Sequence, residues 1–498
     1  MTTLSELLPA GGGGNEVEFI ASGTLPNGKP VILKANGQVE VVAATSTNIS
    51  QSIPAASATS NGYGLAIDFP QISFDPNVSG RFIIAYRDSG ANFSINVGTI
   101  NGTSISFGTR VIISSSEHQW TAIAFDPSEA GKFVACFQDN TSSSILSGVV
   151  GTVSGTSVSL SAKTTLINYN ISNIRISFDK VTAGKFILSY KRASNNYGTV
   201  ASVIRSGDSF TVGTTVTTNN GQTLFQEVEC DPHNADKFAV VYRDYPNSQR
   251  GTIQIGTVSG QNITIGSKIV FQSNAISDSH VAFDPNVANK IVLAFCNNSD
   301  GNKGYVKIGT ISGTSVSFGS NVIFNTGNTS GDSFLEVHMD KKTPNSFLIA
   351  YKDTGNGNKG TAVVGTISNA TISLGSEIVF YNATIYKGDM AVNPNEYGRF
   401  VVFFNDSYGK AIPLQMATTI VTTNVTASNF LGTSTAAYTN GQTAKIMLQG
   451  GISTNQSSLA IGSTYYIQKN GTLATTADEP SVIAGKAVKA TTLLLKGI

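Results

Sequence analysis

Seven acidic or amide residues recur along this chain at nearly constant spacing, 51 to 56 residues apart. A ring of carboxylates could bind cations or polarise a substrate. The surrounding phrase, as in Phe74-Asp75-Pro76, is also typical of a turn, because Asp accepts hydrogen bonds from the backbone that follows and Pro fixes φ. Repeat symmetry would place the seven on separate units, far apart unless they line an axis, so we interpret them as turn formers. They are Asp75, Asp126, Asp179, Asp231, Asp284, Asp340 and Asn393.

A second row of polar residues follows the apolar strand that comes after each turn. Asp occupies this row in five copies, while Arg192 and Asn297 interrupt it. Aromatic and basic residues precede the acid, and such groups can stack on a glycan or hydrogen-bond to it. We take six of them as candidate ligand-binding residues, with a solvated turn beside a packed tyrosine as the alternative. They are Tyr86, Arg87, Tyr242, Arg243, Tyr351 and Lys352.

The histidines and cysteines do not form a constellation of catalytic or metal-binding type. The four histidines fall near the starts of repeats but in different positions, and no two have a metal-ligand spacing. The three cysteines form no CxxC pair and are expected to pack as small residues in strands. We predict no catalytic residues, no metal site and no cofactor. The residues concerned are His118, His233, His280 and His338, together with Cys136, Cys230 and Cys296.

Repeated strands must position these residues. After each turn comes an apolar strand such as RFIIAYRD (81–88), then a segment that usually contains Gly-Thr-Ile or Gly-Thr-Val, a tight turn and an alternating strand such as TSISFGTRVII (103–113). Each of the seven copies therefore predicts four short strands, and no helical periodicity occurs. Four strands repeated at this period are the signature of a β-propeller blade, since one sheet cannot bury both of its faces alone.

We predict an all-β fold, with a seven-bladed β-propeller of four-stranded blades and a small β-domain formed by the N- and C-terminal regions. The predicted boundaries are a leader or docking peptide at 1–15, an N-terminal β segment at 16–60, the propeller at 61–425 and the C-terminal small β-domain at 426–498. An open β-solenoid is the structural alternative. Its coils are usually shorter than this period and lack up-and-down hairpins.

Composition restricts the partners of the chain. Only 13% of the 498 residues are charged and the formal net charge is +1, so nothing marks a footprint for nucleic acid, which we exclude as a partner. No apolar run approaches the roughly 20 residues of a membrane helix, and we expect no membrane insertion. The N-terminus lacks the basic and apolar regions of a signal peptide. Contacts are expected through hydroxyl, amide and aromatic groups.

Both ends of the chain carry phrases of a recognisable kind. GSTYYIQKNGTLATT (462–476) and AGKAVKATTLLLKG (484–497) resemble a small β-domain of tail-fibre and other structural proteins of tailed bacteriophages, notably those of marine bacteria. The leader LSELLPAGGGG (4–14) and the strands after it resemble the opening of such virion proteins. The resemblance covers residues 1–48 and 427–498. It implies a virion component made in the host cytoplasm, whose terminal regions bind other virion proteins or sister chains, as a homo-oligomer.

We therefore expect a non-enzymatic bacteriophage structural protein, a tail fibre or tail-tip component whose propeller serves for display or binds a host-receptor glycan. Capsid decoration as a head fibre protein and a lectin-like adhesin are the alternatives. A glycan-cleaving enzyme is least favoured. Sialidase-like propellers often carry Asp boxes of the type Ser-x-Asp-x-Gly-x-Thr-Trp, and this chain has one tryptophan, Trp120, and no such box. A hydrolytic carboxylate pair would need two acids on one face, and none is singled out.

Overall fold

The computed structural model describes residues 15–49, 58–64, 66–115, 120–329, 334–368 and 370–496. The chain divides into two compact units, a central unit (50–418) and an end unit (1–49 with 419–498). Within the described residues all regular structure is β, apart from short 3-10 turns at Asn140–Ser142, Tyr245–Asn247, Asn298–Asp300 and Thr354–Asn356. The prediction of an all-β chain is confirmed. His118 and residues 1–14 of the predicted docking peptide lie outside the described residues.

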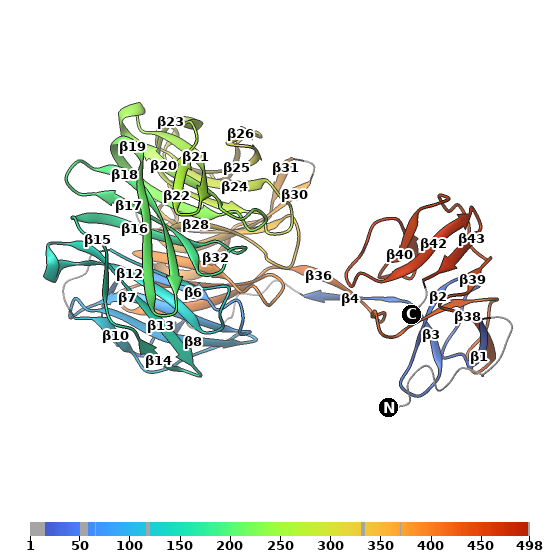
Figure 1. The fold of residues 1–498 in the computed structure, drawn as a ribbon. Helices are drawn as coiled ribbons and strands as arrows, with labels where there is room; N and C mark the ends of the chain where they lie inside the picture. Colours follow the sequence, from blue (N-terminus) through green and yellow to red (C-terminus); the bar gives the residue numbers. More distant parts are fainter. Residues whose placement is uncertain are drawn as a thin grey trace. The chain divides into compact units, whose positions relative to one another are not determined.

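The central unit repeats one antiparallel arrangement (Figure 1). An inner strand pairs with a second strand, which pairs with a third. The inner strands are β6 (Ile67–Phe74), β11 (Thr121–Phe125), β16 (Ile171–Phe178), β19 (Ser209–Cys230), β23 (Ile269–Phe283), β28 (Leu335–Met339) and β33 (Lys387–Val392). The second strands are β7 (Arg81–Asp88), β12 (Lys132–Asp139), β17 (Lys185–Arg192), β20 (Lys237–Asp244), β24 (Lys290–Asn297), β29 (Ser346–Asp353) and β34 (Arg399–Asn405).

The third strand of a repeat pairs at its outer edge with two short segments. Its end pairs with the first segment and its beginning with the second, as β8 does with β9 and β10. The third strands are β8 (Phe93–Asn101), β13 (Ile145–Ser154), β18 (Tyr197–Ser206), β21 (Arg250–Ser259), β25 (Lys303–Ser312), β30 (Lys359–Ser368) and β35 (Gly409–Gln415). The outer segments are β9 (Ser104–Phe107), β10 (Val111–Ser114), β14 (Ser157–Leu160), β15 (Thr164–Ile167), β22 (Asn262–Ile265), β26 (Ser315–Phe318), β27 (Val322–Asn325), β31 (Thr371–Leu374) and β32 (Ile378–Thr384).

Two long strands link neighbouring repeats. In β19, residues 209–222 pair with the third strand of one repeat and residues 223–230 with the second strand of the next. The long strand β23 joins β21 to β24 in the same way. The seventh repeat takes its outer strand from the beginning of the unit, since β5 (Thr59–Ser60) pairs with β35. Thus residues at the two ends of the central unit share one sheet.

The apolar cores lie between neighbouring repeats. Phe82, Ile83, Ile84 and Ala85 of β7 are all fully buried, on both faces of the strand. A sheet covered on both sides by other sheets buries its strands in this way. One cluster joins residues of β6 and β7 to Val401 and Phe403 of the seventh repeat. Each inner strand packs against the inner strand of the next repeat, and β33 packs against β6.

The glycine of the repeated Gly-Thr-Ile segment has a packing role. A Cβ added at Gly98 would lie 2.3 Å from the Phe82 ring, and one at Gly151 would lie 2.0 Å from the Phe133 ring. The second strand therefore places a phenylalanine directly over the third strand, and only glycine leaves room for it. The glycine of this recurring motif therefore allows the second and third strands of one sheet to pack closely.

The turn residues behave alike in all seven repeats. A side-chain oxygen of each accepts a hydrogen bond from the backbone N–H two residues later, at 2.8 to 3.0 Å. The turn interpretation is confirmed. The turns also join repeats, because Asp75 Oδ2 accepts the N–H of Gly131 in the next repeat at 2.9 Å. The Asn395 side chain of the seventh repeat in turn donates to the Pro76 carbonyl of the first at 3.4 Å.

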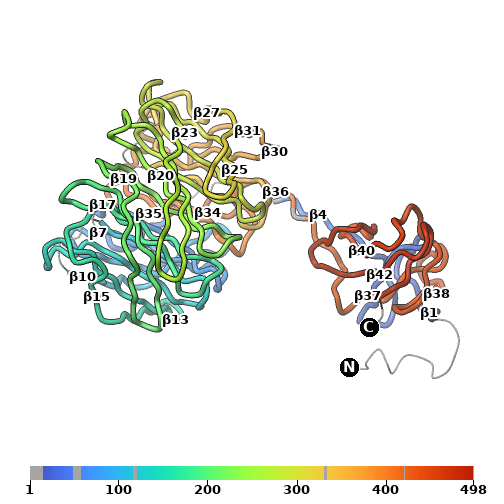
Figure 2. The backbone as a smooth tube through the Cα atoms, turned by 45° about the horizontal axis from the view of Figure 1, so that its top comes forward, coloured from blue at the N-terminus to red at the C-terminus, as the bar shows by residue number. Residues whose placement is uncertain are grey.

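The end unit combines strands from both ends of the chain, and Figure 2 shows its blue and red segments interleaved. One sheet has the order β1-β38-β37-β2-β3, a second has β39-β43-β42-β40-β41, and β4 pairs with β36. Their bounds are β1 (Glu16–Ile20), β2 (Pro30–Leu33), β3 (Val39–Val41), β4 (Ala44–Ile49), β36 (Thr418–Thr423), β37 (Phe430–Ser434), β38 (Thr443–Leu448), β39 (Ile452–Ser453), β40 (Thr464–Ile467), β41 (Leu473–Ala474), β42 (Ile483–Lys489) and β43 (Thr492–Leu495). The phrases 462–476 and 484–496 supply β40 to β43.

Candidate functional site

The three tyrosines predicted to face a ligand lie in the core. Tyr86, Tyr242 and Tyr351 have no exposed surface. Their hydroxyls are used inside the protein: Tyr86 donates to Asn96 Oδ1 at 2.7 Å, and Tyr242 donates to Gln254 Oε1 at 2.9 Å. The structure thus agrees with the alternative of a packed tyrosine, and the proposal that these three rings contact a ligand is corrected. They are strand residues held between sheets, where an aromatic ring contributes packing area.

The basic neighbours of these tyrosines occupy a different environment. Arg87, Arg243 and Lys352 are half-buried near the ends of the second strands. The Nε atoms of Arg87 and Arg243 are buried and make no hydrogen bond to the described residues. Their part in binding a glycan stays a prediction. The acids that follow them stabilise turns. The Asp88 carboxylate, for example, accepts hydrogen bonds from the backbone N–H groups of Gly90 and Asn92 at 2.9 and 3.0 Å.

Sequence reasoning missed the position four residues before each turn residue, which we call the axial position. The inner strands place it at the centre of the unit, where all seven repeats line a cavity of about 400 Å³, the histidine cavity. A second cavity of about 390 Å³, the aromatic cavity, shares Gln71, Arg175, Glu227 and Glu336 with it. The axial residues are Gln71, Ala122, Arg175, Glu227, His280, Glu336 and Asp389. All except Ala122 are polar or charged and line the histidine cavity, and because four of them also line the aromatic cavity, they form a polar layer between the two.

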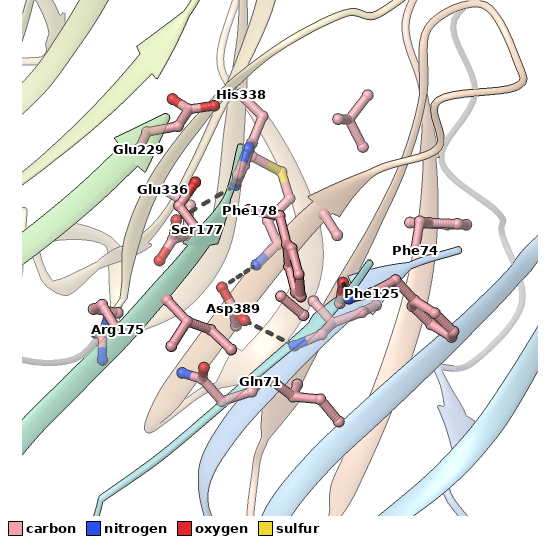
Figure 3. A pocket seen from close by; sticks show the side chains of 18 of the residues that line it. Gln71, Phe74, Phe125, Arg175, Ser177, Phe178, Glu229, Glu336, His338 and Asp389 are labelled. Atoms are coloured by element: carbon pink, nitrogen blue, oxygen red, sulfur yellow. Dashed lines mark hydrogen bonds and ion pairs between the residues drawn. The ribbon is translucent and has the colours of Figure 1, made fainter. Parts of the chain in front are cut away.

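Ion pairs connect neighbouring axial residues. Arg175 Nε lies 2.6 Å from Glu227 Oε1 and 2.8 Å from Oε2. His280 Nε2 lies 2.7 Å from Glu336 Oε2, and Nε2 of His338, two residues further along β28, lies 3.6 Å from the same oxygen. Figure 3 shows Glu336 and His338 close together at one side of the cavity and Asp389 between two backbone nitrogens. Different inner strands thus bring opposite charges together.

Burial and neighbouring charges shift the pKa values of the side chains in this layer. Burial alone would lower the pKa of His280, but the Glu336 carboxylate outweighs it and raises the pKa to about 10. Burial alone would raise the pKa of Glu336, whereas His280 brings it down to about 2. For His338 burial prevails, and its pKa is lowered. Near neutral pH the layer therefore contains an imidazolium–carboxylate pair beside a neutral imidazole.

Two more acids have shifted pKa values, Asp389 in the axial layer and Asp278 in the lining of the aromatic cavity. Burial raises the pKa of Asp389 well above its ordinary value, and the nearby Glu336 carboxylate adds to the effect. Asp389 nevertheless accepts the N–H of Ile72 at 2.8 Å, which links the seventh repeat to the first. Burial also raises the pKa of Asp278, with the charge of Glu227 as a second cause. The centre of the unit is thus a place where carboxylates crowd together.

The aromatic cavity combines rings with polar groups. Phe69, Trp120 and Phe225 line it together with Asn173 and Gln226. The Phe69 and Trp120 ring centroids are 5.2 Å apart, and Lys387 Nζ lies 4.0 Å from the Phe69 centroid. Concave sites that mix aromatic surface with a few polar groups are the usual form of small-molecule sites. The single tryptophan of the chain belongs to this cavity.

Three residues that line the aromatic cavity have a strained backbone conformation. Phe69, Asn173 and Phe225 each lie six residues before a turn residue, and their φ angles are 50°, 52° and 51°. Each lies at an irregularity between the inner and second strands, where the pairing register shifts. A left-handed conformation of a bulky residue costs of order 1–3 kcal/mol, and such residues concentrate at binding sites. Bulges re-aim side chains, and here they bring three positions to one cavity.

One signal in the sequence points to the axial layer. If the seven repeats are aligned on the turn residue, the column four residues earlier holds charged or polar residues in six copies. His280 and Glu336 then occupy the same column, and His338 lies two residues after Glu336. His280 and His338 do occupy different positions of the repeat, as predicted, but the inner strands bring their ring centroids to 5.2 Å apart, which the sequence reasoning did not anticipate.

Comparisons with known proteins yield no family. No family model matches the chain, and no curated protein matches it. Among solved structures, Sqt1 of Saccharomyces cerevisiae is similar with a TM-score of 0.42 and 9% identity, over 75% of this chain and 99% of that one. A fungal lectin of Aleuria aurantia, a six-bladed β-propeller with a fucose recognition mode, has a TM-score of 0.42 and 10% identity, over 63% and 96%. The described residues contain no helix long and apolar enough to cross a membrane.

Proposed function

We propose that the central unit is a closed seven-bladed β-propeller that binds a saccharide in the aromatic cavity, and that the chain attaches a tailed-phage particle to its host. The observation that carries the binding proposal is the aromatic cavity, where strained backbone places Phe69 beside Trp120 and adds Phe225 to the same lining. No catalytic step is proposed for this cavity.

Contacts between the first and the seventh repeats support closure of the propeller. Four of them join β5 to β35, β33 to β6, Asn395 to Pro76 and Asp389 to Ile72. A solenoid would leave its terminal repeats without such mutual contacts. The count of seven follows from the seven inner strands and their seven turn residues.

The chemistry of the aromatic cavity supports an uncharged, hydroxyl-rich ligand. Sugar rings present C–H groups on their faces, which pack against Trp and Phe, and hydroxyls at their edges. Asn173 lines the cavity with an amide and Asp278 adds a carboxyl group, while the Gln226 amide, also in the lining, is held by Ser189, Thr199 and Thr218. Because burial raises the pKa of Asp278, its neutral form can donate as well as accept a hydrogen bond. Such a lining suits a ligand whose hydroxyl groups both donate and accept hydrogen bonds.

The assignment to a virion rests on the phage-like phrases of the terminal regions. Residues 1–49 and 419–498 belong to one compact unit, apart from the repeats. We propose that this unit attaches the protein to other virion proteins or to sister chains, and that the propeller is displayed outward. A tail fibre or tail-tip position is favoured over head decoration, since host attachment belongs to the tail.

Saccharide binding is tested with the full-length chain on a glycan array, followed by titration of the best glycan. Trp120→Ala is expected to weaken binding about 10- to 30-fold, as loss of a central aromatic anchor does. Tyr245→Ala is the matched control, because this tyrosine is 45% exposed on the same unit and does not line the cavity. Equal weakening by both variants, or no binding at all, would overturn the proposal. Turnover of a bound glycan would instead establish the enzymatic alternative.

Trp120 also packs against the core, so loss of fold must be separated from loss of contact. Trp120→Phe keeps an aromatic ring there, and we expect it to retain most of the affinity. The virion assignment is tested separately by imaging purified particles labelled with antibody to the central unit. Label at the tail supports attachment, label over the head supports decoration, and absence of label contradicts a virion role.

A further inference from the structure

We propose that His280, Glu336 and His338 bind a divalent transition-metal ion in the histidine cavity. This inference goes beyond saccharide binding and does not depend on it. Two imidazoles and one carboxylate form a ligand set that zinc and non-haem iron use in proteins.

The distances among the ligand atoms fit one ion. One nitrogen from each histidine and a carboxylate oxygen of Glu336 all lie within 4.8 Å of one another. Two of the separations are 2.7 Å and 3.6 Å. A zinc ion holds such ligands at about 2.0–2.2 Å, which puts neighbouring ligand atoms roughly 3.4 Å apart in tetrahedral geometry. Small side-chain rotations bring the three groups to that separation.

Two rigid strands position the ligands. Glu336 and His338 are two residues apart on β28, so their side chains share one face. His280 comes from β23 in the preceding repeat, where it occupies the same axial position as Glu336. Both strands are paired with a second strand along this stretch. An ion held by all three would therefore connect the fifth repeat to the sixth.

One ligand atom lacks a hydrogen-bond partner. His338 Nε2 is buried and makes no well-aligned hydrogen bond within the described part of the chain, whereas Glu336 Oε2, also buried, forms the ion pair with His280 Nε2 at 2.7 Å. The Val337 N–H lies 3.5 Å from His280 Nδ1, too far to fix a tautomer. Buried polar atoms without partners are uncommon in folded proteins and call for an explanation. A metal ion would bind His338 Nε2 and Glu336 Oε2 together, and it would replace the proton that now lies between His280 and Glu336.

Acidic and basic side chains both line the cavity. The acids are Glu227, Glu229, Glu336 and Asp389, and the bases besides the histidines are Arg175, Lys180 and Lys341, of which Lys341 has its pKa lowered to about 7 by burial. Arg175 is engaged by Glu227. With three protein ligands, the ion keeps at least one position open toward the cavity, where water or an oxygen of a bound molecule can enter.

The test uses the full-length chain, stripped of metal with a chelator and titrated with Co²⁺ while visible absorption is recorded. We expect saturation at one equivalent per chain and displacement of Co²⁺ by Zn²⁺. Glu336→Gln preserves the shape of the side chain and removes its charge, and His338→Ala removes a nitrogen ligand. Each should weaken binding at least about a hundredfold, since even indirect partners of a metal commonly matter by 10- to 100-fold.

His233→Ala is the matched control, because this histidine bonds to the Asp284 carbonyl in a turn and does not line the cavity. It should leave metal binding unchanged. Thermal unfolding of each variant without metal checks the fold, and Zn²⁺ should raise the midpoint of the wild type but not of His338→Ala. The proposal is overturned if Co²⁺ does not bind saturably, or if the ligand variants bind it as tightly as the wild type.

Discussion

The turn position and the axial position lie four residues apart in every repeat, and the repeats use them in opposite ways. Six turn positions carry Asp and one carries Asn, and all seven side chains make the same hydrogen bond. The axial position holds Gln, Ala, Arg, Glu, His, Glu and Asp. Both sets lie on equivalent backbone. Uniform side chains therefore mark what builds the sheets, and varied side chains mark what faces the central cavities.

The largest effect in this comparison is expected from a turn residue. Asp75 is fully buried, accepts two bonds from Arg81 at 3.1 and 2.5 Å, and joins the first repeat to the second. Asp75→Ala leaves that arginine and two backbone N–H groups without their acceptor. We expect the free energy of unfolding to fall by about 3–5 kcal/mol, measured by urea denaturation. A loss below about 1 kcal/mol would contradict the structural role of the turn position.

A smaller effect is expected from Asp75→Asn, because the seventh repeat already has asparagine there. Asn393 accepts the N–H of Asn395 at 3.0 Å, and Arg399 in that repeat contacts Glu396 instead. In the first repeat an amide would keep the turn but lose the charge that faces Arg81. The expected loss is about 2 kcal/mol in the same denaturation experiment. If Asp75→Asn proves as damaging as Asp75→Ala, the carboxylate charge and not the turn geometry is what matters.

The acid at the end of the second strand should show its role through pH. Burial alone would raise the pKa of Asp88, but hydrogen bonds from Asn92, Ser94 and Gly90 lower it below its ordinary value of 3.8. A depressed pKa means that Asp88 stabilises the fold above this value and that the contribution is lost as pH falls through the folded-state pKa. Asp88→Asn should therefore lower stability at pH 7 and flatten its decline below about pH 4. An unchanged acid profile would exclude this role.

The smallest effect is expected at the axial position of the first repeat. Gln71 is half-buried and faces the cavities, and the second repeat already has alanine at this position. Gln71→Ala should change the free energy of unfolding by no more than about 0.5 kcal/mol. Paired with Asp75→Ala, it compares two positions of one repeat four residues apart. A loss above about 1.5 kcal/mol would show that the axial layer also holds the sheets together.

Local chemistry made the repeats and their turns predictable. Phe-Asp-Pro phrases, buried strands such as 81–88 and the Gly-Thr-Ile segments recur in sequence order, so each copy supports the interpretation of the others. The cysteines follow the same logic, since Cys136, Cys230 and Cys296 are buried in strands as expected. Features set by neighbours along the chain are the ones that a single sequence reveals.

The candidate site could not be predicted in this way. Glu336 and His280 are 56 residues apart, and only the cyclic packing of inner strands brings them together. Tyr86 was misplaced for a related reason, because its nearness to Asp88 suggested a loop while the strand continues through both. The bulge at Phe225 contains no glycine or proline that would indicate it in the sequence, and the one at Phe69 is marked only by the adjacent Pro70.

The pairing of β5 with β35 has a consequence for the order of folding. Thr59 and Ser60 emerge early in synthesis, but their partners Ala411 and Lys410 are about 350 residues away. The clasp between them can form only when nearly the whole central unit has left the ribosome, and contacts of such long sequence separation form slowly. Until then the seventh sheet has an unpaired edge. Moving residues 58–61 to a position directly after β35 in the chain would turn this long-range strand pairing into a local hairpin.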